Sequence, residues 1–125
     1  MNMKSRDPEG STGFFNTLYD DVNFLYPLVN QEFSGRVRLD KMHTIYKSYT
    51  VTSDITISID KRFEVVPAAY TELTLVADGS HTVSFSSDFT ATPSSETWDT
   101  TLNKIHKVGI YYDGGVIFYT ITVLN

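Results

Sequence analysis

Alternating apolar and polar residues from about Phe33 onward predict β-strands through most of the chain. The segment Arg36–Asp40 alternates over its whole length. Between residues 44 and 60 one face carries apolar side chains and the other polar ones, ending in the apolar series Ile55, Ile57 and Ile59. This period of two is typical of a strand that is buried on one side only.

Two Asp-Gly dipeptides between alternating runs predict β-hairpins. Asp78-Gly79 lies within Glu72–Ser86, and Asp113-Gly114 lies within Val108–Leu124. Glycine reaches the positive φ angle that such turns require without strain, and aspartate tolerates it better than most residues. The last run, residues 116–124, is apolar on both faces, which favours a central strand or one covered by another subunit.

Roughly seven or eight short strands joined by turn residues favour an all-β fold, an antiparallel β-sandwich or jelly roll over residues 33–125. The polar stretch 86–97 is expected to be an exposed loop between strands. No internal repeat of fixed period is present.

Residues 1–32 are expected to form a separate N-terminal arm. Residues 1–13 are polar and charged, which predicts a tail without a core. Apolar side chains then recur at helix-like spacing until Pro27. Either this segment covers its own domain as a lid, or it anchors the protein to a neighbouring subunit or larger assembly through Phe14, Phe15, Leu18, Tyr19, Val22, Leu25 and Tyr26.

Composition narrows the range of partners. The net charge of −5 and the absence of a basic stripe argue against binding to nucleic acid. The chain has no cysteine, so neither disulfides nor thiolate metal sites support the fold. No stretch has the length of a membrane span or the pattern of a signal peptide, which predicts a protein without a membrane span that is made in a cytoplasm.

No constellation of residues points to catalysis. His43, His81 and His106 are widely separated and lack the spacing of metal ligands, so no metal or other cofactor is expected. The serines of the 86–97 stretch lack a nucleophile-elbow pattern, and no pattern pairs two carboxylates as acid and base. We therefore expect the protein not to be an enzyme.

Three aromatic residues beside polar loops or turns are candidates for glycan binding. Trp98 follows the polar stretch directly, and Tyr111 and Tyr112 precede the Asp113-Gly114 turn. Aromatic rings stack on sugar faces, and the polar tips of tyrosine and tryptophan reach sugar hydroxyls. The alternative is ordinary half-buried packing.

The segment Glu72–Phe89, followed by Trp98, Asn103 and Val108–Gly115, resembles modules of tailed-bacteriophage virion proteins. The likeness covers about residues 70–125 and consists of the two Asp-Gly segments. It implies a non-enzymatic virion component such as a head fibre, a capsid decoration protein or a tail fibre module.

The same resemblance implies a homo-oligomer, with a trimer favoured, that contacts other virion proteins. The arm would attach such a subunit to the particle after synthesis in the host bacterial cytoplasm. The alternative is a carbohydrate-binding or host-adhesion module that recognises host surface glycans.

Overall fold

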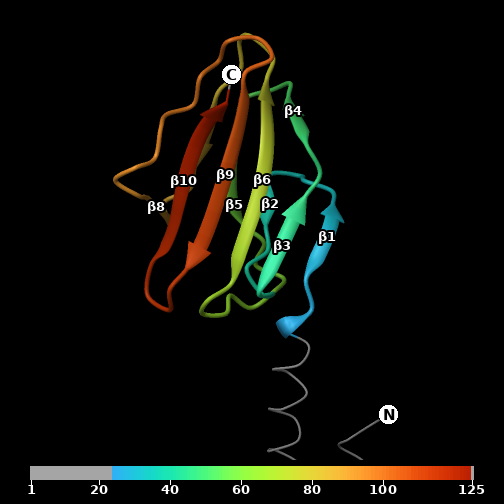
Figure 1. Ribbon diagram of the computed structural model, residues 1–125, viewed down its shortest axis with the longest axis vertical. Helices are drawn as coiled ribbons and strands as arrows, with labels where there is room; N and C mark the ends of the chain where they lie inside the picture. Colours follow the sequence, from blue (N-terminus) through green and yellow to red (C-terminus); the bar gives the residue numbers. More distant parts are fainter. Residues whose placement is uncertain (1–23, 125) are drawn as a thin grey trace, which may run out of the picture.

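The computed structural model describes residues 24–124, which form ten β-strands in two sheets (Figure 1). The predicted all-β class is confirmed. The large sheet has the order β1-β3-β6-β9-β10-β8, with β4 paired to β6. Its strands are β1 (Leu28–Gln31), β3 (His43–Tyr46), β4 (Tyr49–Val51), β6 (Tyr70–Ala77), β8 (Phe89–Ala91), β9 (Ile105–Tyr112) and β10 (Ile117–Leu124). The small sheet is β2 (Arg36–Val37), β5 (Ile55–Ile59) and β7 (Val83–Phe85), in that order.

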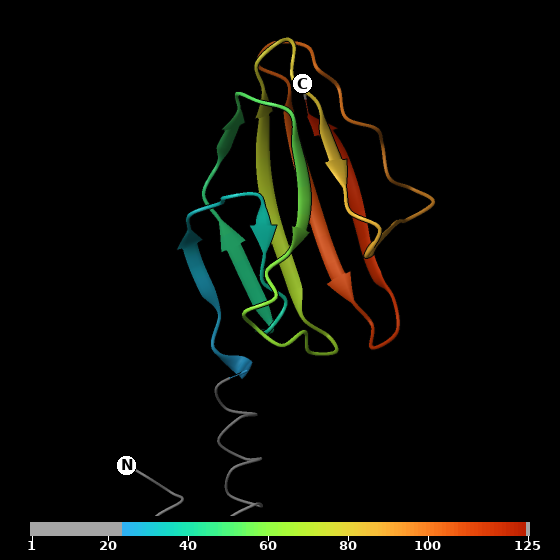
Figure 2. The same cartoon turned by 180° about the vertical axis from the view of Figure 1, so that it is seen from behind.

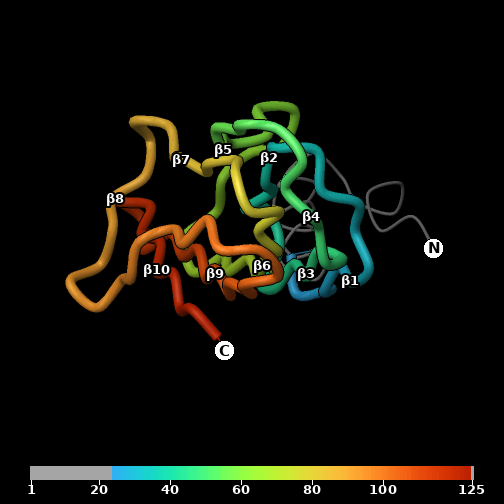
Figure 3. Tube along the Cα trace, turned by 90° about the horizontal axis from the view of Figure 1, so that it is seen from above, coloured from blue at the N-terminus to red at the C-terminus, as the bar shows by residue number. Residues whose placement is uncertain are grey.

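The two sheets lie in separate layers, with the small sheet behind the large one in the view of Figure 1 (Figures 2 and 3). Both sheets contribute to one hydrophobic core, because period-two alternation turns one side of each strand inward. In β6 the residues Leu73, Leu75 and Ala77 share one face and are buried. The core also contains Val37, Val51, Ile57, Ile59, Val108, Ile110 and Ile121.

The sheets are mixed, whereas the sequence pattern predicted antiparallel pairing. Among the described residues only β6 with β9 and β9 with β10 pair antiparallel. From β1 to β3, and again from β4 to β8, the chain crosses from one sheet to the other at each step. Each strand therefore enters its sheet in the same direction as a strand beside it and pairs parallel with that strand. β3 and β4 both pair parallel with β6, β3 with the first part of that strand and β4 with its last part.

The predicted hairpin around Asp113-Gly114 is confirmed. β9 and β10 pair in continuous register from Tyr112 opposite Ile117 to Ile105 opposite Leu124. Oδ1 of Asp113 accepts hydrogen bonds from the backbone N–H groups of Gly115 (2.8 Å) and Val116 (2.7 Å). Gly114 has a φ of 104°, which explains why glycine occupies this place.

The predicted hairpin around Asp78-Gly79 is wrong, although the turn itself forms. Gly79 has a φ of 101°, and Oδ1 of Asp78 accepts the N–H of His81 at 3.0 Å. The chain then leaves the large sheet, because the N–H of Thr82 donates to Oδ1 of Asp54 (2.9 Å) and β7 pairs with β5. Contacts with residues far away in sequence therefore hold this segment in the small sheet.

The polar stretch 86–97 contains β8 and also covers one edge of the large sheet. β8 pairs with the first three residues of β10, Ile117–Tyr119. Beyond them, the N–H of Ile121 donates to Oγ of Ser95 and the N–H of Val123 donates to Oε1 of Glu96, each at 2.9 Å. Two polar side chains thus continue the hydrogen bonding of β10 where strand pairing ends.

Only the end of the predicted arm belongs to the described residues. Phe14, Phe15, Leu18, Tyr19 and Val22 lie outside them. Residues 28–31 of the arm form β1, which pairs with β3 at the side of the large sheet away from β8.

Candidate functional site

A groove of about 380 Å³ lies on the outer face of the large sheet, over β6, β9 and β10. Strand register builds it, since Tyr70 lies opposite Tyr111, and Tyr111 lies opposite Phe118. Alternation turns these three rings away from the core, so they form a row across three strands. We call Tyr70, Tyr111 and Phe118 the aromatic row.

Gly109 lies beside the aromatic row and lets Tyr70 lie close to β9. A Cβ atom at position 109 would come within 2.6 Å of the Tyr70 hydroxyl oxygen. Burial of the Tyr70 hydroxyl raises the pKa of this tyrosine, and the nearby Glu72 carboxylate raises it further. Glycine at 109 therefore permits the Tyr70 ring to occupy the place that a side chain would fill.

Hydroxyl and charged groups complete the lining of the groove. The hydroxyls of Thr92 and Thr120 are 2.7 Å apart, and Nζ of Lys107 donates to Oγ1 of Thr74 at 2.9 Å. Nε2 of His43 lies 3.1 Å from Oε2 of Glu72, and the His43 ring packs against Tyr70 with ring centroids 5.3 Å apart. The groove thus offers aromatic surface on one side and hydrogen-bonding groups on the other.

The three aromatic residues predicted for glycan binding do not converge. Tyr111 lines the groove and is 41% exposed. Tyr112, the next residue of β9, points to the other face, where it packs against the core and its hydroxyl donates to the carbonyl of Gly114 (3.0 Å). Trp98 lies near the opposite end of β9, stacked on His106. Sequence reasoning missed Tyr70 and Phe118, which only the strand register places beside Tyr111.

Trp98 holds the segment before β9 against the sheet. Its ring stacks on the buried His106 ring with centroids 3.8 Å apart, and its Nε1–H donates to the carbonyl of His81 (3.0 Å). Nε2 of His106 accepts the N–H of Asp99 at 2.9 Å. Burial lowers the pKa of His106, because removal from water disfavours the charged ring. This contact set indicates a packing role for Trp98.

Two arginine–carboxylate pairs lie beside the Phe63 ring. Arg62 and the buried Asp60 carboxylate form two side-chain hydrogen bonds of 2.9 and 2.7 Å, and these lower the pKa of Asp60 to about 2. Arg38 pairs with Asp40 in the same two-bonded way and lies 3.5 Å from the centroid of the Phe63 ring. All four charged groups have partners here, so the cluster is structural.

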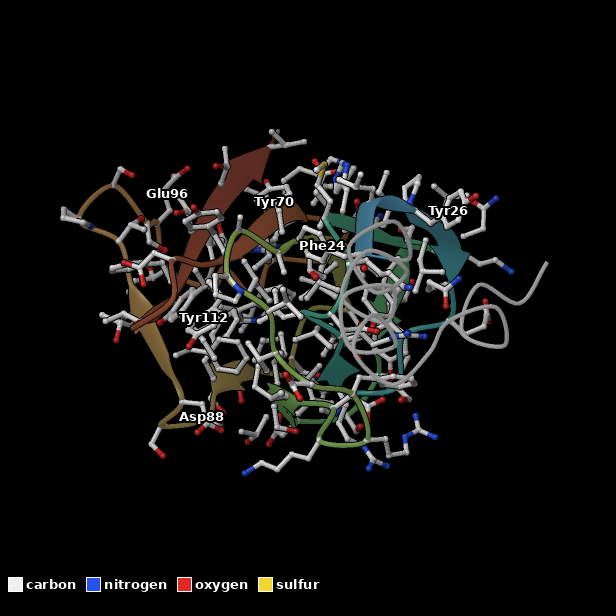
Figure 4. The ribbon with its side chains drawn as sticks, turned by 90° about the horizontal axis from the view of Figure 1, so that it is seen from below. Phe24, Tyr26, Tyr70, Asp88, Glu96 and Tyr112 are labelled. Carbon is white, nitrogen blue, oxygen red and sulfur yellow. The ribbon has the colours of Figure 1, made fainter. Side chains whose placement is uncertain are left out.

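Apolar side chains are exposed at the end of the molecule where the described residues begin. Leu25 is 53% and Tyr26 63% exposed. Met42, also exposed, is next to them, because its N–H donates to the carbonyl of Phe24 at 2.9 Å. Seen from below, Phe24 lies over the middle of the molecule, whereas Tyr26 lies at the rim away from Glu96 and Tyr112 (Figure 4). Val29, which follows in β1, is 52% exposed. We call Leu25, Tyr26, Val29 and Met42 the apolar base.

Within residues 24–124 no group of histidine and acidic side chains is arranged to hold a metal ion. In the same range no helix is long and apolar enough to cross a membrane.

Comparison of the chain with protein-family models, with curated proteins and with solved structures found no match. Function has therefore to be inferred from the chain's own residues.

Proposed function

We propose that this protein is a non-enzymatic structural component of a bacteriophage virion, such as a head fibre, decoration or tail protein. It would be made in the host bacterial cytoplasm and form a homo-oligomer, with a trimer favoured. It would attach to other virion proteins through its N-terminal arm. The two sheets on a shared core are compatible with a β-sandwich or jelly roll as the outward-facing domain.

One observation carries the proposal: the apolar base is exposed beside the start of the described residues. The preceding chain continues with further apolar side chains at Phe14, Phe15, Leu18, Tyr19 and Val22. A contiguous exposed apolar patch marks an interaction surface more often than scattered single residues do. Together these residues would supply apolar side chains for subunit contacts and anchoring.

The base is tested with the full chain by size exclusion coupled to light scattering. Wild type is expected to elute as a closed oligomer, and the double variant Leu25→Ser, Tyr26→Ser as a smaller species, because the changes remove apolar contact area. Leu102→Ser is the matched control, since Leu102 is 63% exposed but lies in the loop before β9, away from the base. A monomeric wild type would contradict the role of the base.

Virion membership is tested by mass spectrometry of particles from the phage that encodes the chain. We expect its peptides in the particle band of a density gradient at many copies per particle. Their presence only in the soluble lysate would overturn the proposal.

Host adhesion through glycans is the second candidate function. The exposed Tyr111 within a groove that combines aromatic and hydroxyl groups favours it. A virion subunit can anchor by its base and bind a glycan on its outer sheet face, so both functions are compatible.

A further inference from the structure

We infer that the groove over β6, β9 and β10 is a binding site for a neutral saccharide. The inference rests on the adhesion function proposed above and moves its site from the Trp98, Tyr111 and Tyr112 set to the aromatic row. Tyr70 and Tyr111 would stack against sugar rings, and the polar groups beside them would bind sugar hydroxyls.

The aromatic row has the geometry that a stacked ligand needs. Antiparallel pairing places Tyr70, Tyr111 and Phe118 on neighbouring strands, about 5 Å apart at the backbone. The missing side chain at Gly109 leaves room for the Tyr70 ring against β9. Because the strands that carry the aromatic row are hydrogen-bonded to one another, the spacing of its three residues is set before any ligand arrives, which lowers the entropic cost of binding.

The polar lining suits sugar hydroxyls, which both donate and accept hydrogen bonds. Thr92, Thr120 and Thr122 offer hydroxyls of the same dual character, Glu72 offers acceptors and Lys107 offers donors. Glu72 and Lys107 are opposite charges, and the chain as a whole carries −5. Charge complementarity therefore favours a neutral saccharide over a polyanion.

A peptide or a second copy of the chain fits this face less well. The strands under the groove pair with one another, and the outer edge of β10 is covered by β8, Ser95 and Glu96, so an added strand finds little free edge there. Most of the threonine and charged side chains already pair within the protein, so a protein surface that buried them would have to match their remaining hydrogen-bonding capacity. A saccharide meets those needs with its own hydroxyls.

The test is affinity electrophoresis of the full chain through gels containing a neutral glucan, mannan or galactan, with polygalacturonate as the acidic comparison. At least one neutral polysaccharide is expected to retard wild type. Tyr111→Ala and Gly109→Ala are each expected to weaken that retardation about tenfold, because the first removes a stacking ring and the second displaces the Tyr70 hydroxyl. Unchanged thermal unfolding of both variants would show that they remain folded.

Leu102→Ala is the control, because Leu102 is 63% exposed and lies outside both the groove and the apolar base, and it should bind like wild type. Loss of binding in Trp98→Ala but not in Tyr111→Ala would overturn the groove site and leave the adhesion function standing. No retardation by any polysaccharide would overturn both. Retardation by polygalacturonate alone would overturn the neutral class, and a change of oligomer mass in Tyr111→Ala would identify the groove as a subunit contact instead.

Discussion

Leu75→Ala is expected to lower the free energy of unfolding by roughly 2 to 5 kcal/mol, the range for removing a fully buried leucine side chain. Leu75 is 1% exposed and lies in β6, the strand that pairs with β3, β4 and β9. The paired strands on both sides limit how far the surroundings can close around the cavity. Urea unfolding followed by circular dichroism measures the loss.

Leu102→Ala is the control for this substitution, because the same atoms are removed from a side chain that is 63% exposed. Its effect should stay within about 0.5 kcal/mol, as for most surface changes. If the two variants unfolded at the same urea concentration, the position of β6 at the centre of the large sheet would be wrong.

Lowering the pH from 7 to 5 is expected to destabilise the folded protein through His106. Its pKa is lowered in the folded state by burial, so the unfolded chain binds the proton first. Above the ordinary value of 6.5 both states are neutral and the full stability is present. As the pH falls below 6.5, the unfolded state gains the proton and the free energy of unfolding falls until the folded pKa is passed.

His106→Gln is the variant that isolates this effect. A glutamine side chain can accept the N–H of Asp99, as Nε2 of His106 does, but does not titrate. The variant should show a flatter stability profile between pH 7 and 5 by thermal unfolding. Asp60 and Asp78, both with a pKa lowered to about 2, lose their contributions only between 3.8 and 2, outside this window. An equally steep profile in the variant would contradict the role of His106.

The two Asp-Gly turns show how far local sequence can predict this fold. Both turns form, with Gly79 and Gly114 at positive φ, because turn geometry depends on adjacent residues. Only the second returns its chain to the same sheet. The direction after Asp78 depends on Asp54 and on pairing with β5, which lie too far away in sequence for a local pattern to show.

The candidate site was predictable only in part for the same reason. Tyr111 was found because it stands beside a recognisable turn. Tyr70 begins a strand and has no local mark, and its place beside Tyr111 follows from register across strands far apart in sequence. By sequence alone, Gly109 is a residue that weakens a strand, and only the structure shows that it makes room for Tyr70. Trp98 was a candidate because it directly follows a polar stretch, yet its ring stacks on His106.

The side chains of Ser95 and Glu96 bear on how densely copies of this protein can be arrayed. An unpaired strand edge is a template on which another chain can add, and repeated addition produces filaments or aggregates. Along the upper part of β10, an incoming strand would first have to displace the two oxygen acceptors that already hold Ile121 and Val123. Crowded copies of the protein could then stand side by side without fusing through this edge of their large sheets.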